Sequence, residues 1–245
     1  MATISHNPVL RRGGFDEAAA AGATMTLGGT VAKTFLLLGI AAAGMVYVWA
    51  GMPGIGLSER LVYPILTGSF VFGVVLLIGT SKNPEYASIT GPIYAAVQGL
   101  ALGVVTLIFE AKYPGLPKQA ALLTAATLLV MLVAYRAGWI RATERFTTIV
   151  VSCTAAVFVF YIIAFTLSLF GVLIPFLHEG GVIGIGFSLF VVGLAALNLI
   201  LDFDTIEQGI GRAPAALEWF AAFGLVVTLI WLYFEILRLL GKLRR

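Results

Sequence analysis

Charged residues are scarce in this sequence: Asp, Glu, Lys and Arg make up only 11% of its 245 residues. A soluble domain carries about 25%, because its surface has to be hydrated. Meanwhile 60% of the residues are hydrophobic, and the mean hydropathy is +1.02. The core of a soluble fold cannot hide so much apolar surface, whereas a lipid bilayer can. The net charge of +3 is small and gives no indication of nucleic-acid binding.

Cysteine and histidine are almost absent as well. The one cysteine, Cys153, lies in an apolar run and cannot form an internal disulfide. The two histidines, His6 and His178, are far apart in the sequence and lie in polar ends or loops. Because no ligand spacing typical of a metal site occurs, we expect no firm metal site and no required cofactor.

The chain contains instead seven apolar runs of membrane-spanning length. A helix needs about 20 apolar residues to cross roughly 30 Å of hydrocarbon, and it satisfies its own backbone polar groups there. We therefore predict an all-α membrane protein with seven transmembrane helices. The predicted spans are about 31–52, 61–80, 87–110, 119–135, 146–173, 182–204 and 216–240. Residues 1–29 are predicted to form a partly disordered, cytoplasmic N-terminal tail, followed by one transmembrane domain over residues 30–245.

Small residues in two of the runs indicate helix packing. Gly99 and Gly103 in the third run lie four residues apart, a spacing that lets another helix approach closely. Gly224 belongs to a small-residue face in the first half of the last run. We interpret all three glycines as packing positions.

The orientation is predicted from the basic residues of the short loops. With seven spans, eight Lys and Arg residues fall on the side of the N-terminus and seven on the other, but four of these seven belong to the C-terminal end. Without those four, the excess predicts a cytoplasmic N-terminus. A re-entrant last segment would place both termini inside, but a last run of about 25 residues favours a full span.

The polar residues of the last two runs are the functional candidates, because an ionisable residue inside a membrane is costly. Two of the three aspartates, Asp202 and Asp204, end the sixth run, and Glu235 lies inside the seventh. On a regular helix Asn198 and Asp202 share a face, whereas Asp204 points about 200° away from Asp202. The two aspartates therefore cannot both point into one site, and Asp202 heads the more polar face.

Structural alternatives stay open for these charges. Glu235 either faces a narrow water path at the centre of the bundle or pairs with Arg238 at i+3 near the interface. Asp204, Glu207 and Glu218 can likewise form an ordinary solvated turn. A carboxylate balanced between burial and a neighbouring cation responds to pH and attracts a divalent cation. Since a calcium cage needs about six to eight oxygens, the two aspartates are expected to make only weak calcium contact.

The same stretches resemble a known family. LILDFDTIEQG (199–209) and LVVTLIWLYFEILRLLG (225–241) look like the last two helices of the Bax inhibitor-1-like, or transmembrane BAX inhibitor motif, membrane proteins. QGLALG (98–103) is similar to a glycine-containing motif of that family's third helix. MTLGGTVAKTFLLL (25–38) resembles a bacterial branch, which implies a location in the bacterial plasma membrane, and the resemblance covers nearly the whole chain.

The resemblance implies that the last helix lies at the centre of a bundle of the other six, and that the activity is a pH-sensitive calcium leak. In the family, an acidic pair from the sixth and seventh helices binds protons and gates the pore. The first position falls on Asp204, but the second falls on Thr228, so the second carboxylate is missing. The family also has a basic partner near the inner end of the second helix, and Lys82 is the residue that corresponds to it here.

These observations predict a membrane channel that leaks calcium or another cation and senses pH. The alternative is a membrane-embedded regulator that binds another membrane protein in stress or quality control. Enzyme activity is not expected, because aspartyl chemistry needs two converging carboxylates and serine chemistry needs a well-placed base. The oligomeric state and the physiological partner are left open by the sequence.

Overall fold

The computed structural model describes residues 23–51, 59–171 and 181–244, and the structural statements below refer to these ranges. They contain seven long helices and one turn of 3₁₀ helix, η1 (Pro84–Tyr86). The long helices are α2 (Leu27–Gly51), α3 (Glu59–Lys82), α4 (Ala87–Lys112), α5 (Leu116–Arg136), α6 (Glu144–Leu169), α8 (Val182–Gly209) and α9 (Leu217–Leu243). All seven are long and apolar enough to cross a bilayer, so the predicted fold class is confirmed.

Most of the predicted N-terminal tail lies outside the described residues. The helix α2 begins at Leu27, inside the last residues that were assigned to the tail. Just before α2, the Met25 amide donates to the Ala213 carbonyl at 2.8 Å. Thr24 also pairs with Pro214 in an isolated antiparallel bridge. The segment before the first helix is thus tied to the turn between α8 and α9.

Local chemistry explains where several helices begin. The Thr143 hydroxyl accepts a hydrogen bond from the Phe146 amide at 3.3 Å and so caps α6. Gly115 precedes α5 with φ of 79°, a left-handed conformation that favours glycine. Pro117 follows in the first turn of α5, where its missing N–H costs no helical hydrogen bond. These residues explain why α5 and α6 begin where they do.

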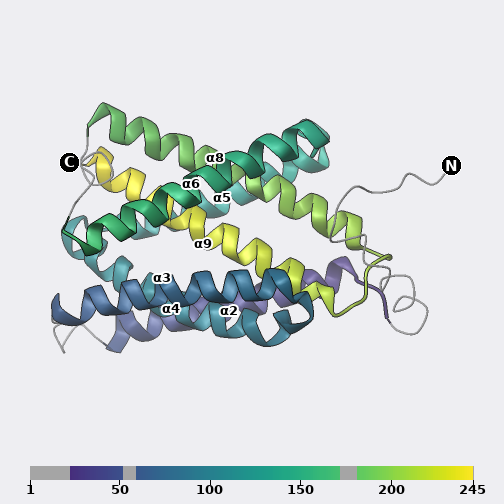
Figure 1. The fold of residues 1–245 in the computed structure, drawn as a ribbon, viewed down its shortest axis with the longest axis horizontal. Helices are drawn as coiled ribbons and strands as arrows, with labels where there is room; N and C mark the ends of the chain where they lie inside the picture. Colours follow the sequence, from purple (N-terminus) through teal and green to yellow (C-terminus); the bar gives the residue numbers. More distant parts are fainter. Residues whose placement is uncertain (1–22, 52–58, 172–180, 245) are drawn as a thin grey trace.

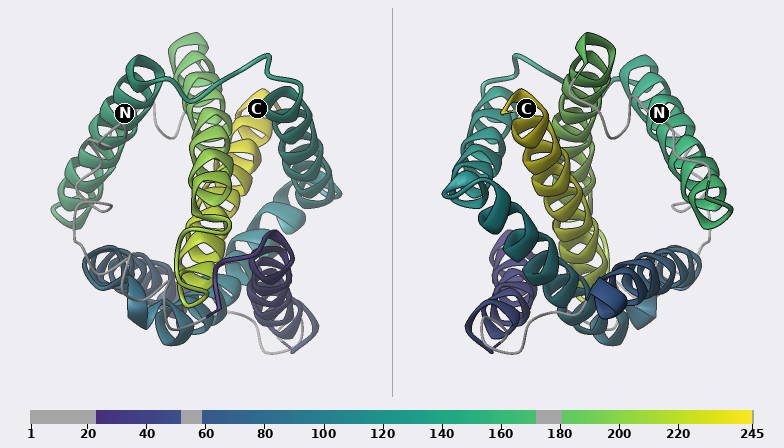
Figure 2. Two further views of the ribbon diagram at one scale, coloured as in Figure 1. Left: turned by 90° about the vertical axis from the view of Figure 1, so that its right-hand side faces the viewer. Right: turned by 90° about the vertical axis from the view of Figure 1, so that its left-hand side faces the viewer.

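The last helix, α9, lies at the centre of the bundle (Figure 1). It packs against α2, α4, α5 and α8. Within an apolar stretch of 18 residues, 72% of the residues of α9 are buried, against 11% for the corresponding stretches of α3 and α6. The outer helices therefore face lipid, whereas α9 faces protein on most sides. Figure 2 shows α8 and α9 side by side, with α2, α3 and α4 grouped below them.

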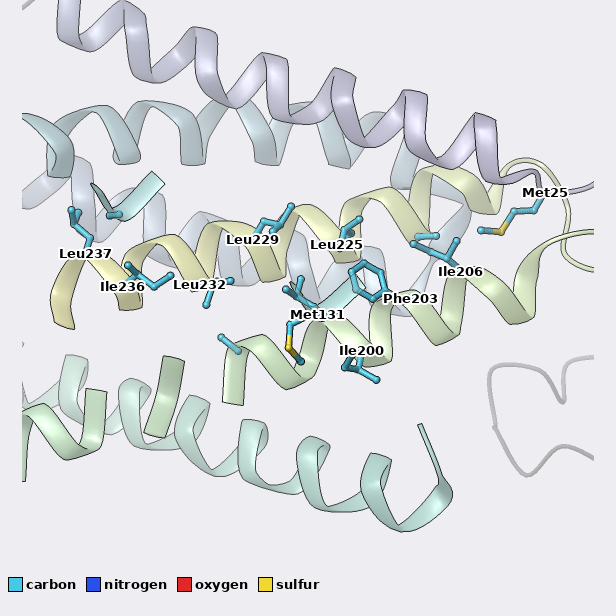
Figure 3. Packing of buried hydrophobic residues seen from close by; sticks show 14 of the residues in the cluster. Met25, Met131, Ile200, Phe203, Ile206, Leu225, Leu229, Leu232, Ile236 and Leu237 are labelled. Carbon is cyan, nitrogen blue, oxygen red and sulfur yellow. The ribbon is translucent and has the colours of Figure 1, made fainter. Parts of the chain in front are cut away.

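Apolar side chains from α8 and α9 form most of the largest core cluster, shown in Figure 3. On α9 the cluster includes Leu225, Leu229, Leu232, Ile236 and Leu237, and on α8 it includes Ile200, Phe203 and Ile206. Met131 joins it from α5, and Met25 joins it beside the turn between α8 and α9. The cluster extends along most of α9, so this helix is held by packing over most of its length.

The helices α2 and α4 approach each other through glycines. A Cβ placed on Gly99 would overlap the backbone of Ala41, and one on Gly103 would lie 2.6 Å from the Cβ of Val48. No larger side chain fits there unless the helices move apart. In lipid, where apolar attraction between helices is weak, such close contact supplies the packing energy.

The central helix is continuous over 27 residues, or about 40 Å of helix rise. It is therefore long enough for a full span, as expected from the length of the last apolar run. The start of α2 and the end of α9 lie at opposite ends of the bundle (Figure 1). Which end faces the cytoplasm remains a prediction from the charge distribution.

Candidate functional site

Buried polar side chains occur along α9 from one end to the other. They are Glu218, Thr228, Glu235 and Lys242, each at most 8% exposed. Thr228, Glu235 and Lys242 repeat every seven residues and therefore share a helix face. A buried polar group in a membrane protein needs a partner, because no water replaces a missing hydrogen bond in hydrocarbon. The partner of each side chain shows what that part of α9 can do.

Asp202 of α8 lies against the middle of α9. Its Oδ1 is 3.7 Å from the position that a Cβ on Gly224 would occupy, an ordinary van der Waals distance, so the carboxylate packs directly beside this glycine. The Thr228 hydroxyl lies within hydrogen-bonding reach of the same carboxylate and also donates to the Gly224 carbonyl at 3.2 Å. The other oxygen, Oδ2, is buried and has no hydrogen-bond partner among the described residues.

We call Asp202, Gly224 and Thr228 the Asp202 site. The Thr228 hydroxyl donates to the Gly224 carbonyl beside the carboxylate, and one carboxylate oxygen has unused acceptor capacity. In a low-dielectric setting, that oxygen is a ready acceptor for a proton, a water molecule or a cation. The site joins the central helix to its closest partner helix.

Asp204 points to another helix. Its carboxylate accepts hydrogen bonds from the Tyr135 hydroxyl of α5, at 3.3 Å, and from the side-chain amide of Gln208. Tyr135 also lies 2.5 Å from Glu207 Oε2. The resemblance assigns the first acidic position to Asp204, whereas the residue that contacts Thr228 is Asp202. The physical reason is that α8 stays helical to Gly209, so it does not unwind to turn Asp204 towards α9.

Asn198 lies one turn before Asp202 in α8. Its side-chain amide donates to the Thr154 hydroxyl of α6 at 2.8 Å and to the Leu194 carbonyl at 2.9 Å. Asn198 thus links α8 to α6, beside the Asp202 site. The expected polar face of the sixth span is present. Asn198 on this face contacts α6, whereas Asp202 contacts α9.

Glu235 is bound by two groups. The Tyr161 hydroxyl of α6 donates to Glu235 Oε1 at 2.9 Å, and Arg238 Nη1 lies 3.2 Å from the same oxygen. Arg238 also donates to the Tyr161 hydroxyl at 2.8 Å and lies over the tyrosine ring at 5.1 Å from its centroid. Of the two alternatives for Glu235, the structure shows the pairing with Arg238. Tyr161 could not be found from the sequence, because its partner is 74 residues away.

The two ends of α9 are held by further polar contacts. At the end, the Lys242 ammonium donates to the Gly184 carbonyl at 3.0 Å and to the Ser188 hydroxyl at 2.9 Å. At the start, Glu218 forms an ion pair with Lys33 of α2. Glu218 is only 5% exposed, so it is not part of a solvated turn.

Lys82, the basic partner implied by the resemblance, lies exposed in the last turn of α3. Within the described ranges it forms no ion pair with an acidic residue of α8 or α9. In the same part of the chain, no three His, Cys, Asp or Glu side chains converge as a metal site. Any cation contact at the Asp202 site would therefore rest on very few protein ligands.

Comparison with known proteins adds one finding. The sequence model of a family described as Bax inhibitor 1 like matches residues 7–245. The match covers nearly the whole chain and confirms the resemblance that the motifs of the last two helices indicate. The bacterial branch of that resemblance remains a prediction. No significant match was found among curated proteins or among solved structures.

Proposed function

Because the chain belongs to the Bax inhibitor 1 like family, we propose that this multi-pass membrane protein is a cation leak channel. Calcium is the proposed permeant ion, and protons are the proposed regulator. The observation that carries the proposal is the Asp202 carboxylate, which is held between the central helix and α8 with one buried oxygen lacking a partner among the described residues. An acidic group in this position is expensive to keep inside a membrane bundle, which favours a functional reason for it.

The charges of the two buried acids of α9 are already compensated. Glu218 is paired with Lys33, and Glu235 is paired with Arg238. Asp202 has no cation within salt-bridge distance among the described residues. Of these three acids, Asp202 is thus the one whose charge is available to a proton or a passing cation.

Few titratable groups face Asp202 from the surrounding helices. On α9 its neighbours are Gly224 and Thr228, and neither titrates. On its own helix the nearest acids, Asp204 and Glu207, contact Tyr135 of α5. Towards α6, the neighbouring polar pair is Asn198 with Thr154. A change of charge at Asp202 would therefore be the main electrostatic event at this site.

The small number of oxygen ligands at the Asp202 site suits a cation that passes through better than a cation that stays bound. Calcium is held tightly by about six to eight oxygens, which this site does not supply from protein side chains. The ionised carboxylate attracts a cation, whereas the protonated form does not. Protonation of Asp202 would thus change the local field between α8 and α9, which gives a physical route from pH to flux.

The test is calcium flux into liposomes that contain the purified protein and a calcium-sensitive dye, measured over a pH series. The parent protein is expected to show flux that changes with pH, and Asp202→Asn is expected to lose most of this change. Asp204→Asn is the matched control, since it removes the same charge two residues away. Flux no higher than in protein-free liposomes would refute the channel. A pH response lost in Asp204→Asn but kept in Asp202→Asn would move the sensor to Asp204.

A further inference from the structure

A lateral groove of about 410 Å³ opens between α2 and α5. Both helices pack against α9, but they make little contact with each other. The residues of α4 and α9 between them, including Leu102 and Ile230, form the floor. The volume lies within the range of small-molecule sites. None of the three residues of the Asp202 site lines the groove.

Small side chains keep the groove open. Its walls include Ala41 and Ala42 on α2, and Ala121, Thr124 and Ala125 on α5. Larger residues at these five positions would fill the space between the two helices. The groove is therefore a consequence of the sequence and not only of the helix spacing.

The floor offers little to a polar ligand. The Thr106 hydroxyl lies 3.1 Å from the Tyr233 hydroxyl and 3.8 Å from Met45 Sδ. These polar atoms bond to one another, and most of the remaining lining residues are apolar. Such a surface suits a hydrocarbon chain, since a polar ligand would lose its hydrogen bonds to water without replacement.

The length of the groove matches one leaflet of a membrane. On α2 the lining runs from Leu38 to Trp49, and on α5 it runs from Pro117 to Leu128. Each stretch corresponds to about 16 Å of helix rise. Half of the hydrocarbon thickness of a bilayer is about 15 Å. An acyl chain of one leaflet would thus follow the groove from the membrane surface to near the midplane.

Basic side chains lie at the mouth of the groove. Lys118 lines it and is exposed. Arg244 lies close by, since its guanidinium donates to the side-chain oxygen of Gln119 at 3.2 Å. Glu110 also lines this end, but both its carboxylate oxygens accept from the Gly115 amide at 3.1 Å. Exposed cations beside an apolar groove favour a negatively charged lipid head group.

We propose that the groove binds one acyl chain of an anionic phospholipid whose head group contacts Lys118 and Arg244. The site is separate from Asp202, so lipid binding does not depend on the proposed channel activity. The basic mouth sets the class of head group, and the apolar walls set the class of chain. The lipid completes the bundle where α2 and α5 leave a gap.

The test is native mass spectrometry of the detergent-purified full chain, titrated with phosphatidylglycerol or with phosphatidylcholine of the same acyl chains. The parent is expected to retain one phosphatidylglycerol in preference to phosphatidylcholine. Ala125→Phe fills the groove and is expected to abolish this retention. Ala126→Phe is the matched control, because Ala126 is also exposed but does not line the groove. Equal loss in both variants, or no preference for the anionic lipid in the parent, would overturn the proposal.

A second pair of variants tests the head-group contact without any risk to packing. Lys118→Gln is expected to lower the preference for phosphatidylglycerol about fivefold, the value of one basic residue near a membrane surface. Lys112→Gln is the control, since Lys112 is exposed and lies over the Tyr113 ring instead of lining the groove. An equal effect of both substitutions would show unspecific attraction and refute the site. A change of oligomeric state in Ala125→Phe with lipid retention unchanged would assign the groove to a second copy instead.

Discussion

Lys33 near the start of α2 forms an ion pair with Glu218 in the first turn of α9. The same carboxylate accepts hydrogen bonds from the Thr26 amide at 2.7 Å and from the Thr26 hydroxyl at 2.9 Å. The Lys33 ammonium also lies over the Trp219 ring, 5.5 Å from its centroid. The first and last described helices are therefore joined at one end of the bundle by charge as well as by packing.

Glu218→Gln is expected to destabilise the protein, because it removes the charge that Lys33 and Thr26 both contact. Breaking a buried ion pair costs about 3–5 kcal/mol. The Lys33 side chain is 23% exposed, so solvent lowers the expected loss to roughly 1–3 kcal/mol. Thermal unfolding in detergent measures the effect. Glu144→Gln is the control, since Glu144 is exposed in the first turn of α6; equal losses for the two variants would contradict the role of the ion pair.

Thr228→Asp would place a second carboxylate opposite Asp202. Two adjacent carboxylates lose their protons in two coupled steps. The pH response of calcium flux is therefore expected to spread over a wider range than in the parent. Thr228→Val, which has nearly the same shape and no titratable group, is the control in the same liposome assay. An unchanged profile for Thr228→Asp would argue against contact between position 228 and the pH sensor.

Tyr161→Phe removes the hydroxyl that links Glu235 to Arg238. Glu235 would keep Arg238 but lose one donor, and an unmade hydrogen bond to a buried group costs about 1–3 kcal/mol. We expect a lower unfolding temperature in detergent. Tyr63→Phe, at a tyrosine that is 74% exposed on α3, is expected to change little. If both variants unfold at the parent temperature, the Tyr161 bridge contributes nothing to stability.

Gly99→Ala is expected to push α2 away from α4, because the new Cβ would overlap the backbone of Ala41. Gly193→Ala on α8 is the matched control, since a Cβ there meets nothing within 4 Å. Where a new Cβ has free space, replacing a helical glycine by alanine stabilises the helix by roughly 1 kcal/mol in water. The two variants should thus change stability in opposite directions, as measured by thermal unfolding. Destabilisation by Gly193→Ala alone would contradict the packing interpretation.

Much of the fold could be predicted because its signals are local. The length and hydropathy of each apolar run are properties of consecutive residues, and they mark all seven helices. The fourth run, expected at about 119–135, forms α5 from Leu116 to Arg136. The sixth run was expected to end near 204, but α8 continues to Gly209, because a helix extends beyond the apolar stretch that identifies it.

The candidate site could be predicted only in part. Helical periodicity placed Asp202 and Asp204 on different sides of one helix, which agrees with their contacts to Thr228 and Tyr135. Periodicity does not say which neighbour each side meets. Tyr161 was missed for that reason, since nothing in its local sequence points to Glu235.

By itself, the sequence determined that this chain is a seven-helix membrane protein of the Bax inhibitor 1 like family, and it marked the polar residues of the last two helices. Only the tertiary structure decided their partners. Lys33 and Glu218 are separated by 185 residues, and Tyr161 and Glu235 by 74. The physical reason is that hydropathy and periodicity act within a helix, whereas ion pairs and buried hydrogen bonds depend on which helices pack together and at what rotation.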